Sequence, residues 1–152
     1  MSEDTLTGSP KSSGGRRVPS DPDLFRLTES DEERPRLLGS YSSSSGLSFW
    51  PRRRRCPVTL GPVVDVELSP IGELYAWTWL QVARMGAVTY GTGGGFGVGQ
   101  IELPEGVRIQ GPLKGSPEDW EIGSKMGLTY LTVGETSDGA ELVTLQFEAV
   151  AE

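Results

Sequence analysis

Apolar and polar residues alternate along five extended segments in the second half of this chain, at residues 73–82, 97–103, 107–113, 126–133 and 141–150. In the last segment Val143, Leu145 and Phe147 alternate with polar residues, as on a strand with one buried face. Between the third and fourth segments, Ser-Pro-Glu-Asp at 116–119 has the cap, first-turn proline and acidic residues of a short helix. This order predicts an OB-fold, a small five-stranded Greek-key barrel, within residues 63–152.

The first of these segments is apolar on both faces. Tyr75, Trp77 and Trp79 alternate with Leu74, Ala76 and other small or apolar residues. If one face fills the barrel, the aromatic face needs a cover, which either the N-terminal part of the chain or a partner could supply.

The N-terminal part divides into three segments. Residues 1–20 are rich in Ser, Gly, Pro and charge, which predicts a disordered tail. Residues 21–36 begin with Asp-Pro-Asp and contain a small apolar group, which predicts a short docking helix. Residues 37–62 contain two turn-like segments with the ligand spacing of a zinc ribbon, which predicts a degenerate ribbon.

Ser42, Ser45, Cys56 and Thr59 have the spacing of the four ligands of a zinc ribbon. Structural zinc needs four strong nitrogen or sulfur donors, and only Cys56 is one. We therefore expect a degenerate ribbon that holds no metal and is ordered by packing of Tyr41, Leu47, Phe49 and Trp50. Arg52 to Arg55 precede Cys56 and favour a thiolate, so a reactive cysteine is the alternative to a leftover ribbon position.

The composition limits the chemistry of this chain. It has 152 residues, a formal net charge of −7, one cysteine and no histidine, which excludes histidine-dependent triads, bases and metal sites within the chain. There is no apolar run long enough to span a membrane and no hydrophobic stretch typical of a signal peptide. We expect a cytoplasmic protein that is not an enzyme by itself and has no cofactor or metal of its own.

Two segments are candidate contact sites for a partner or a ligand. Arg52, Arg53, Arg54 and Arg55 could bind phosphate groups or could form a solvated basic turn. The glycine-rich connection at 83–96 could approach an anion or a partner closely, or could be a loop without a ligand. Its candidate contact residues are Tyr90, Gly93, Gly94, Gly95 and Phe96.

Several motifs resemble those of a known family, and they occur in the family's order at 39–46, 49–51, 55–59, 72–78 and 117–123. The first and third are similar to Gly-Ser-x-Cys-x-x-Cys-Gly and Cys-Pro-x-Cys, with three of the four cysteines replaced. The others are similar to Phe-x-Pro, Gly-x-Val-Tyr-Ser-Phe-Thr and Pro-Glu-Asp-Leu-x-Ile-Gly. Together they resemble the domain of unknown function 35 family, a rubredoxin-like zinc ribbon followed by an OB-fold, from about residue 21 to residue 150.

The resemblance implies a non-catalytic subunit of a thiolase-like enzyme that acts on acyl-CoA, of the thiolase or steroid side-chain aldolase type found in degradation pathways such as steroid degradation. Such a subunit packs against the catalytic chain in a hetero-oligomer and helps to hold or channel the CoA thioester, with acyl-CoA bound at the interface. The catalytic residues are then expected on the partner.

Two other functions stay open. An OB-fold with exposed aromatic residues and an arginine run could bind single-stranded nucleic acid. Against it, acidic residues far outnumber basic ones after residue 57, and such a barrel repels a phosphate backbone. A free-standing acyl-CoA-binding protein is the third possibility.

Overall fold

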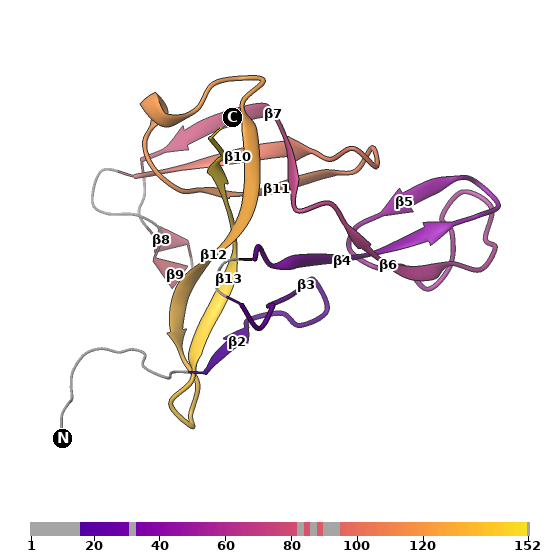
Figure 1. The fold of residues 1–152 in the computed structure, drawn as a ribbon, viewed down its shortest axis with the longest axis horizontal. Helices are drawn as coiled ribbons and strands as arrows, with labels where there is room; N and C mark the ends of the chain where they lie inside the picture. Colours follow the sequence, from indigo (N-terminus) through magenta and orange to yellow (C-terminus); the bar gives the residue numbers. More distant parts are fainter. Residues whose placement is uncertain (1–15, 31–32, 82–83, 86–87, 90–94, 152) are drawn as a thin grey trace.

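A closed barrel of five strands forms the C-terminal half of the molecule in the computed structural model, which describes residues 16–30, 33–81, 84–85, 88–89 and 95–151 (Figure 1). The barrel strands are β7 (Ile71–Leu80), β10 (Phe96–Glu102), β11 (Arg108–Leu113), β12 (Lys125–Glu135) and β13 (Glu141–Ala149). Neighbouring strands run in the order β11-β10-β7-β12-β13, and a parallel contact between Leu113 and Phe147 closes the ring. The prediction of a mainly β, five-stranded OB-type barrel is confirmed.

The inward-facing residues that the alternation predicted fill the barrel. Val143 and Phe147 of β13 are fully buried, and Leu145 is 7% exposed. Met126, Leu128, Ile101 and Ile109 pack with them in one core. The only helix in the described ranges is the 3-10 turn Pro117–Asp119, which lies between the third and fourth barrel strands as predicted. No helix in those ranges is long and apolar enough to cross a membrane.

A β-bulge in the first barrel strand separates the three aromatic residues expected on one face. Opposite β10, Leu74 pairs with Ile101 and Ala76 pairs with Gln100, so that Tyr75 is the extra residue. Trp77 packs edge-on against Trp120, with ring centroids 4.9 Å apart, and Trp79 also packs against the core. Tyr75 remains outside, 47% exposed, beneath the guanidinium of Arg108. The two tryptophans therefore pack on the barrel core and are only partly exposed.

Two glycines of β10 make room for these large side chains. A Cβ atom at Gly97 would lie 2.7 Å from Cη2 of Trp120, and one at Gly99 would lie 2.9 Å from Cδ1 of Leu74. Both glycines are therefore needed for packing, whatever the preceding loop does.

The predicted helix within residues 21–36 is wrong. Asp21 begins a turn in which its carboxylate accepts a hydrogen bond from the backbone N–H of Asp23 (3.1 Å), and the chain then continues as the strand β3 (Phe25–Arg26). Phe25, which is 1% exposed, pairs with Leu37 of the next strand. The local Asx-type turn and the burial of Phe25 in an extended conformation override the helix signal of Asp-Pro-Asp.

The prediction of disorder for residues 1–20 is wrong at its C-terminal end, whereas residues 1–15 lie outside the described residues. Arg17–Pro19 form strand β2, which pairs in parallel with Glu141–Val143 of β13. Arg17 lies 3.8 Å from the carboxylate of Glu141 and 5.2 Å from the ring of Tyr130. This strand covers the part of β13 that would otherwise be an open sheet edge.

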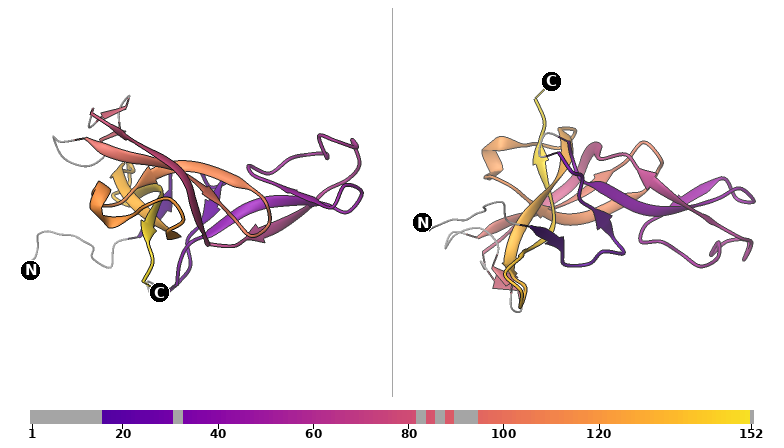
Figure 2. Two further views of the ribbon diagram at one scale, coloured as in Figure 1. Left: turned by 90° about the horizontal axis from the view of Figure 1, so that it is seen from above. Right: turned by 60° about the horizontal axis from the view of Figure 1, so that its bottom comes forward.

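A second, smaller sheet projects from the barrel (Figures 1 and 2). Its central strand β4 (Arg36–Ser42) pairs with β3, β5 (Leu47–Phe49) and β6 (Val64–Leu68). Leu37 and Leu68 lie opposite each other at its base, and both belong to the main core. We call residues 36–68 the projecting unit. Because β6 pairs with β4, this unit extends to Leu68 and not to the predicted boundary at residue 62.

We predict that Gly97→Ala destabilises the protein by about 1–3 kcal/mol, because the added methyl group would collide with the buried indole of Trp120. Urea unfolding followed by tryptophan fluorescence measures the change. Gly134→Ala in β12 is the matched control, since no atom lies within 4 Å of a Cβ there. Equal unfolding midpoints for the two variants would contradict the packing role of Gly97.

Candidate functional site

Two turns lie side by side in the projecting unit. The first is closed by a hydrogen bond from the Gly46 N–H to the Ser42 carbonyl (2.7 Å), and the second by one from the Leu60 N–H to the Cys56 carbonyl (2.8 Å). The hydroxyls of Ser44 and Thr59, one from each turn, are 2.6 Å apart.

The structure brings Ser42, Ser45, Cys56 and Thr59 together between these turns. Cys56 Sγ is fully buried, lies 3.4 Å from Ser45 Oγ and accepts a hydrogen bond from the Thr59 N–H, also at 3.4 Å. Ser42 Oγ accepts a hydrogen bond from the Ser45 N–H (3.3 Å). One thiol and three hydroxyls do not fit a structural zinc ion, which needs four strong donors. Elsewhere, the part of the chain that the structure describes has no group of three or more His, Cys, Asp or Glu residues arranged for a metal.

The surroundings of Cys56 favour its ionised form. Burial of the thiol raises its pKa, but hydrogen bonds from the side chains of Ser42, Ser45 and Thr59 and from the Thr59 backbone outweigh this effect and lower the pKa from 9.0 to about 6. In its ionised form, the sulfur accepts these hydrogen bonds within the chain. Its burial keeps it away from large reagents, which argues against a nucleophilic role.

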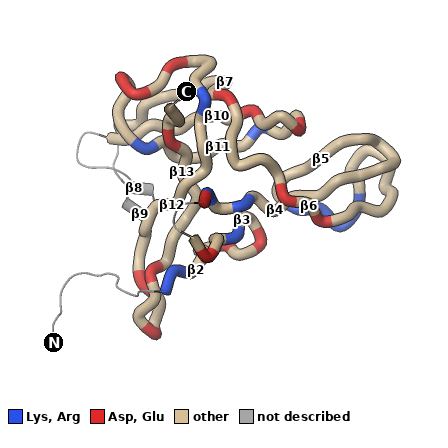
Figure 3. The backbone as a smooth tube through the Cα atoms, in the orientation of Figure 1, with Lys and Arg blue, Asp and Glu red and all other residues tan. Residues whose placement is uncertain are grey.

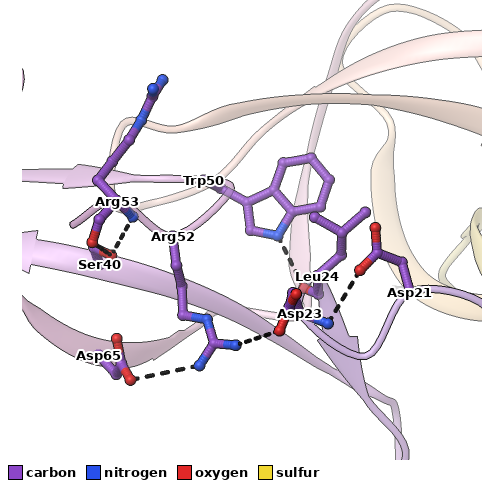
Figure 4. Close-up of polar contacts among 8 residues, drawn as sticks. All are labelled: Asp21, Asp23, Leu24, Ser40, Trp50, Arg52, Arg53 and Asp65. Atoms are coloured by element: carbon purple, nitrogen blue, oxygen red, sulfur yellow. Dashed lines mark hydrogen bonds and ion pairs between the residues drawn. The ribbon is translucent and has the colours of Figure 1, made fainter.

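Hydrogen bonds anchor the base of the unit (Figure 4). Buried Ser40 accepts from the Arg53 N–H (2.8 Å) and donates to the Arg53 carbonyl (3.4 Å). The indole N–H of Trp50 donates to the Leu24 carbonyl (3.0 Å). Of the four residues expected to order the unit by packing, Phe49 and Trp50 are partly buried, whereas Tyr41 and Leu47 are exposed. Polar contacts therefore take over part of the role that we assigned to apolar packing.

The four arginines do not act as one cationic group. Arg52 lies 3.2 Å from Asp23 and 3.4 Å from Asp65, which neutralise it (Figure 4). Arg55 donates a hydrogen bond to the Leu60 carbonyl (3.3 Å). Arg53 and Arg54 are exposed, and the described residues offer no carboxylate within ion-pair distance of either side chain. Of the four arginines, Arg53, Arg54 and Arg55 are therefore the ones available to bind a ligand or a partner protein.

The candidate residues of the glycine-rich connection are only partly described. Tyr90, Gly93 and Gly94 lie outside the described residues. Gly95 is buried with φ at +103°, and a Cβ there would lie 2.1 Å from the Leu80 carbonyl oxygen, so the position requires glycine. Phe96 is 4% exposed and pairs with Leu80. These two residues belong to the barrel. Because they are buried, they do not form a contact surface.

Sequence reasoning missed the exposed apolar residues of the second turn. Val58 and Leu60 are 66% and 69% exposed, and Val64 is 60% exposed. The signal was present in Pro-Val-Thr-Leu-Gly at 57–61, because apolar residues in a tight turn have no core to face.

Two solved structures are similar to this chain. No protein-family model matches the chain. The solved structure of the Ltp2-ChsH2(DUF35) aldolase superimposes on it with a TM-score of 0.59 at 21% sequence identity, covering 76% of this chain and 86% of that one. The chain has a domain-of-unknown-function-35 fold. A DUF35-family protein of unknown function from Sulfolobus solfataricus gives a TM-score of 0.48 at 15% identity, covering 76% of each chain.

The sequence itself is similar to the benzoylsuccinyl-CoA thiolase subunit BbsA of Thauera aromatica. The two are 29% identical over 130 residues, which cover 85% of this chain and 86% of BbsA. A match of this length includes both the projecting unit and the barrel. Together with the fold shared with the Ltp2-ChsH2(DUF35) aldolase, this match confirms the resemblance to the domain of unknown function 35 family that the sequence motifs indicated.

We predict that the combined substitutions Ser42→Cys, Ser45→Cys and Thr59→Cys create a tetrahedral metal site with Cys56. The variant should bind one zinc ion per chain and melt at a higher temperature with zinc than without it. Cobalt titration reports the site through its visible absorption bands, and the same triple variant with Cys56→Ser is the control. A variant that binds cobalt without tetrahedral thiolate bands would show that the four positions are not arranged as we describe.

We predict that stability depends on pH through Cys56. Since its pKa is lowered from 9.0 to about 6 on folding, its contribution is fully present above pH 9 and is lost as the pH falls through 6. The free energy of unfolding should therefore rise between pH 6 and pH 9, as measured by urea unfolding. Cys56→Ser should remove this part of the slope. An unchanged slope in the variant would assign the pH dependence to other groups.

Proposed function

We propose that this chain is a non-catalytic subunit of a thiolase-like enzyme, of the thiolase or steroid side-chain aldolase type, which acts on an acyl-CoA. The observation that carries this proposal is the similarity to BbsA, a thiolase subunit, over most of both chains. The fold shared with the Ltp2-ChsH2(DUF35) aldolase supports it.

The side chains available here favour an accessory role. The chain has no histidine, and its one cysteine is buried among hydroxyls. A nucleophile and a general base within hydrogen-bond reach of a substrate are the usual requirements of thioester chemistry. The partner chain therefore supplies the catalytic residues, and this subunit contributes binding surface and solubility in the cytoplasm.

The subunit helps to hold the CoA thioester at the interface with its partner and needs no cofactor of its own. The exposed guanidiniums of Arg53 and Arg54 suit phosphate groups. A hollow of about 470 Å³ on the barrel is lined by Glu73, Glu102 and Lys125, and two carboxylates there disfavour a phosphate. The arginine segment is therefore the better anion contact of the two, and at the interface it suits either a CoA phosphate or a carboxylate of the partner.

Nucleic-acid binding is the weaker alternative. Trp77 and Trp79, which such a function would use for stacking, pack against the barrel core. Acidic and basic residues are mixed over the barrel (Figure 3), and the chain as a whole has a net charge of −7. Neither feature provides the continuous positive groove that tracks a single strand.

We predict that the tagged protein, purified from an extract of its native cells, brings down a thiolase-like chain in a fixed stoichiometry. Size-exclusion chromatography with light scattering gives the mass of the complex, and mass spectrometry identifies the chain. The complex, and not this chain alone, should turn over an acyl-CoA. Recovery of the protein alone, or with nucleic acid that salt removes, would overturn the proposed function.

A further inference from the structure

Exposed apolar side chains gather on the projecting unit. Among the described residues, seven large hydrophobic side chains are exposed, and five of them lie on this unit, which is smaller than the barrel. These five, which we call the apolar tip, are Tyr41, Leu47, Val58, Leu60 and Val64. Such a concentration on a small element is typical of an interaction surface.

The strand pairing and the turn contacts place these side chains at one end of the unit. Tyr41 and Val64 are cross-strand partners of β4 and β6, at the ends of the strands that meet the turns. Leu47 follows the first turn, and Val58 and Leu60 belong to the second. The Ser44–Thr59 and Cys56–Ser45 contacts hold the two turns together. The tip is thus presented on a preformed framework, away from the barrel (Figure 2).

Leu60 gives an independent indication that the tip acts outside the chain. Its φ of +64° is the only positive φ at a non-glycine position in the described ranges. A leucine in this conformation is strained, and glycine or asparagine would relieve the strain. Leu60 is also 69% exposed, so it gains little packing within the chain in return. A strained and exposed leucine is best explained by a contact with another molecule.

The charges around the tip define the chemistry of that molecule. Arg53, Arg54 and Arg55 are exposed, and the hydrogen bond from Arg55 to the Leu60 carbonyl joins this basic segment to the tip. In a symmetric pair of this chain, the same patches would face each other and bring the arginine segments together. A second copy is therefore disfavoured, and the complementary surface is an apolar patch bordered by carboxylates.

We propose that the apolar tip and Arg53 to Arg55 form the surface through which this chain docks onto its catalytic partner. The partner contributes an apolar patch with an acidic border. This inference rests on the proposed function and extends it, because it assigns the docking contact to the tip of the projecting unit and not to the barrel.

The test compares complex formation by full-length variants with the purified thiolase-like chain, measured by surface plasmon resonance. The double variant Val58→Asp/Leu60→Asp should bind at least tenfold more weakly than the wild type, because it places carboxylates within an apolar contact. Ile122→Asp is the matched control, since Ile122 is 60% exposed on the barrel, and its affinity should stay within twofold of the wild type. Circular dichroism and thermal melting confirm that both variants are folded.

A second pair of variants tests the charged part of the surface. Arg53→Glu/Arg54→Glu should slow association at least fivefold at low salt and reduce its salt dependence. The Ser40 contacts are to the Arg53 main chain, so this change leaves them in place. Lys114→Glu, at an exposed position on the barrel, is the control and should have a smaller effect.

The outcomes separate this inference from the proposed function. If the wild type binds the thiolase-like chain and the Val58/Leu60 variant binds equally well, the docking surface is wrong while the proposed function stands. If the Ile122 control loses affinity instead, docking occurs through the barrel. If the wild type binds no thiolase-like chain, both proposals fail. A wild-type dimer that the tip variant converts to a monomer would identify the tip as a contact between copies of this chain.

Discussion

The contact between the turns that follow β4 and precede β6 is the constraint on which the projecting unit depends. The hydroxyls of Ser44, Ser45 and Thr59 and the sulfur of Cys56 hold these turns together. Ser45, Cys56 and Thr59 are among the four positions that have the spacing of zinc ligands. Each neutral hydrogen bond contributes a net stability of about 0.5–1.5 kcal/mol, whereas a structural zinc ion contributes on the order of 10 kcal/mol or more in isolated peptides. The contact therefore fixes the shape of the turns with much less energy than a metal would supply.

The remaining order comes from the opposite end of the unit. Phe25, Leu37 and Leu68 are almost fully buried and make the base of the projecting sheet continuous with the barrel core. The Ser40–Arg53 and Trp50–Leu24 hydrogen bonds then tie the segment between the turns to this base. Stability should accordingly decrease from base to tip, since buried apolar area decreases in the same direction. A partner bound at the tip would stabilise the part of the molecule that has the least internal support.

The sequence predicted the barrel well because its strands obey one simple rule. Alternation places Val143, Leu145 and Phe147 inside, and the order of elements then leaves few topologies. The same rule failed at Tyr75, because a bulge shifts the alternation by one residue and no local signal marks it. The helix predicted after Asp21 failed since the pairing of Phe25 with Leu37 is a tertiary contact. Spacing alone indicated that Ser42, Ser45, Cys56 and Thr59 lie together, but the exposure of Tyr41 and Leu47 depends on the three-dimensional arrangement.

Two features of the projecting unit lower the folding stability of this chain when it is alone: the left-handed Leu60 and the exposed apolar side chains. A left-handed leucine costs about 1–2 kcal/mol relative to glycine, and exposed apolar side chains contribute no burial. The turns around Cys56 are held only by weak hydrogen bonds, and the side chains on their surface are apolar. A turn selected only for the stability of the free chain would carry glycine at residue 60 and polar residues at 58 and 64. The leucine and the two valines are therefore better understood as parts of an interface whose second half belongs to another protein.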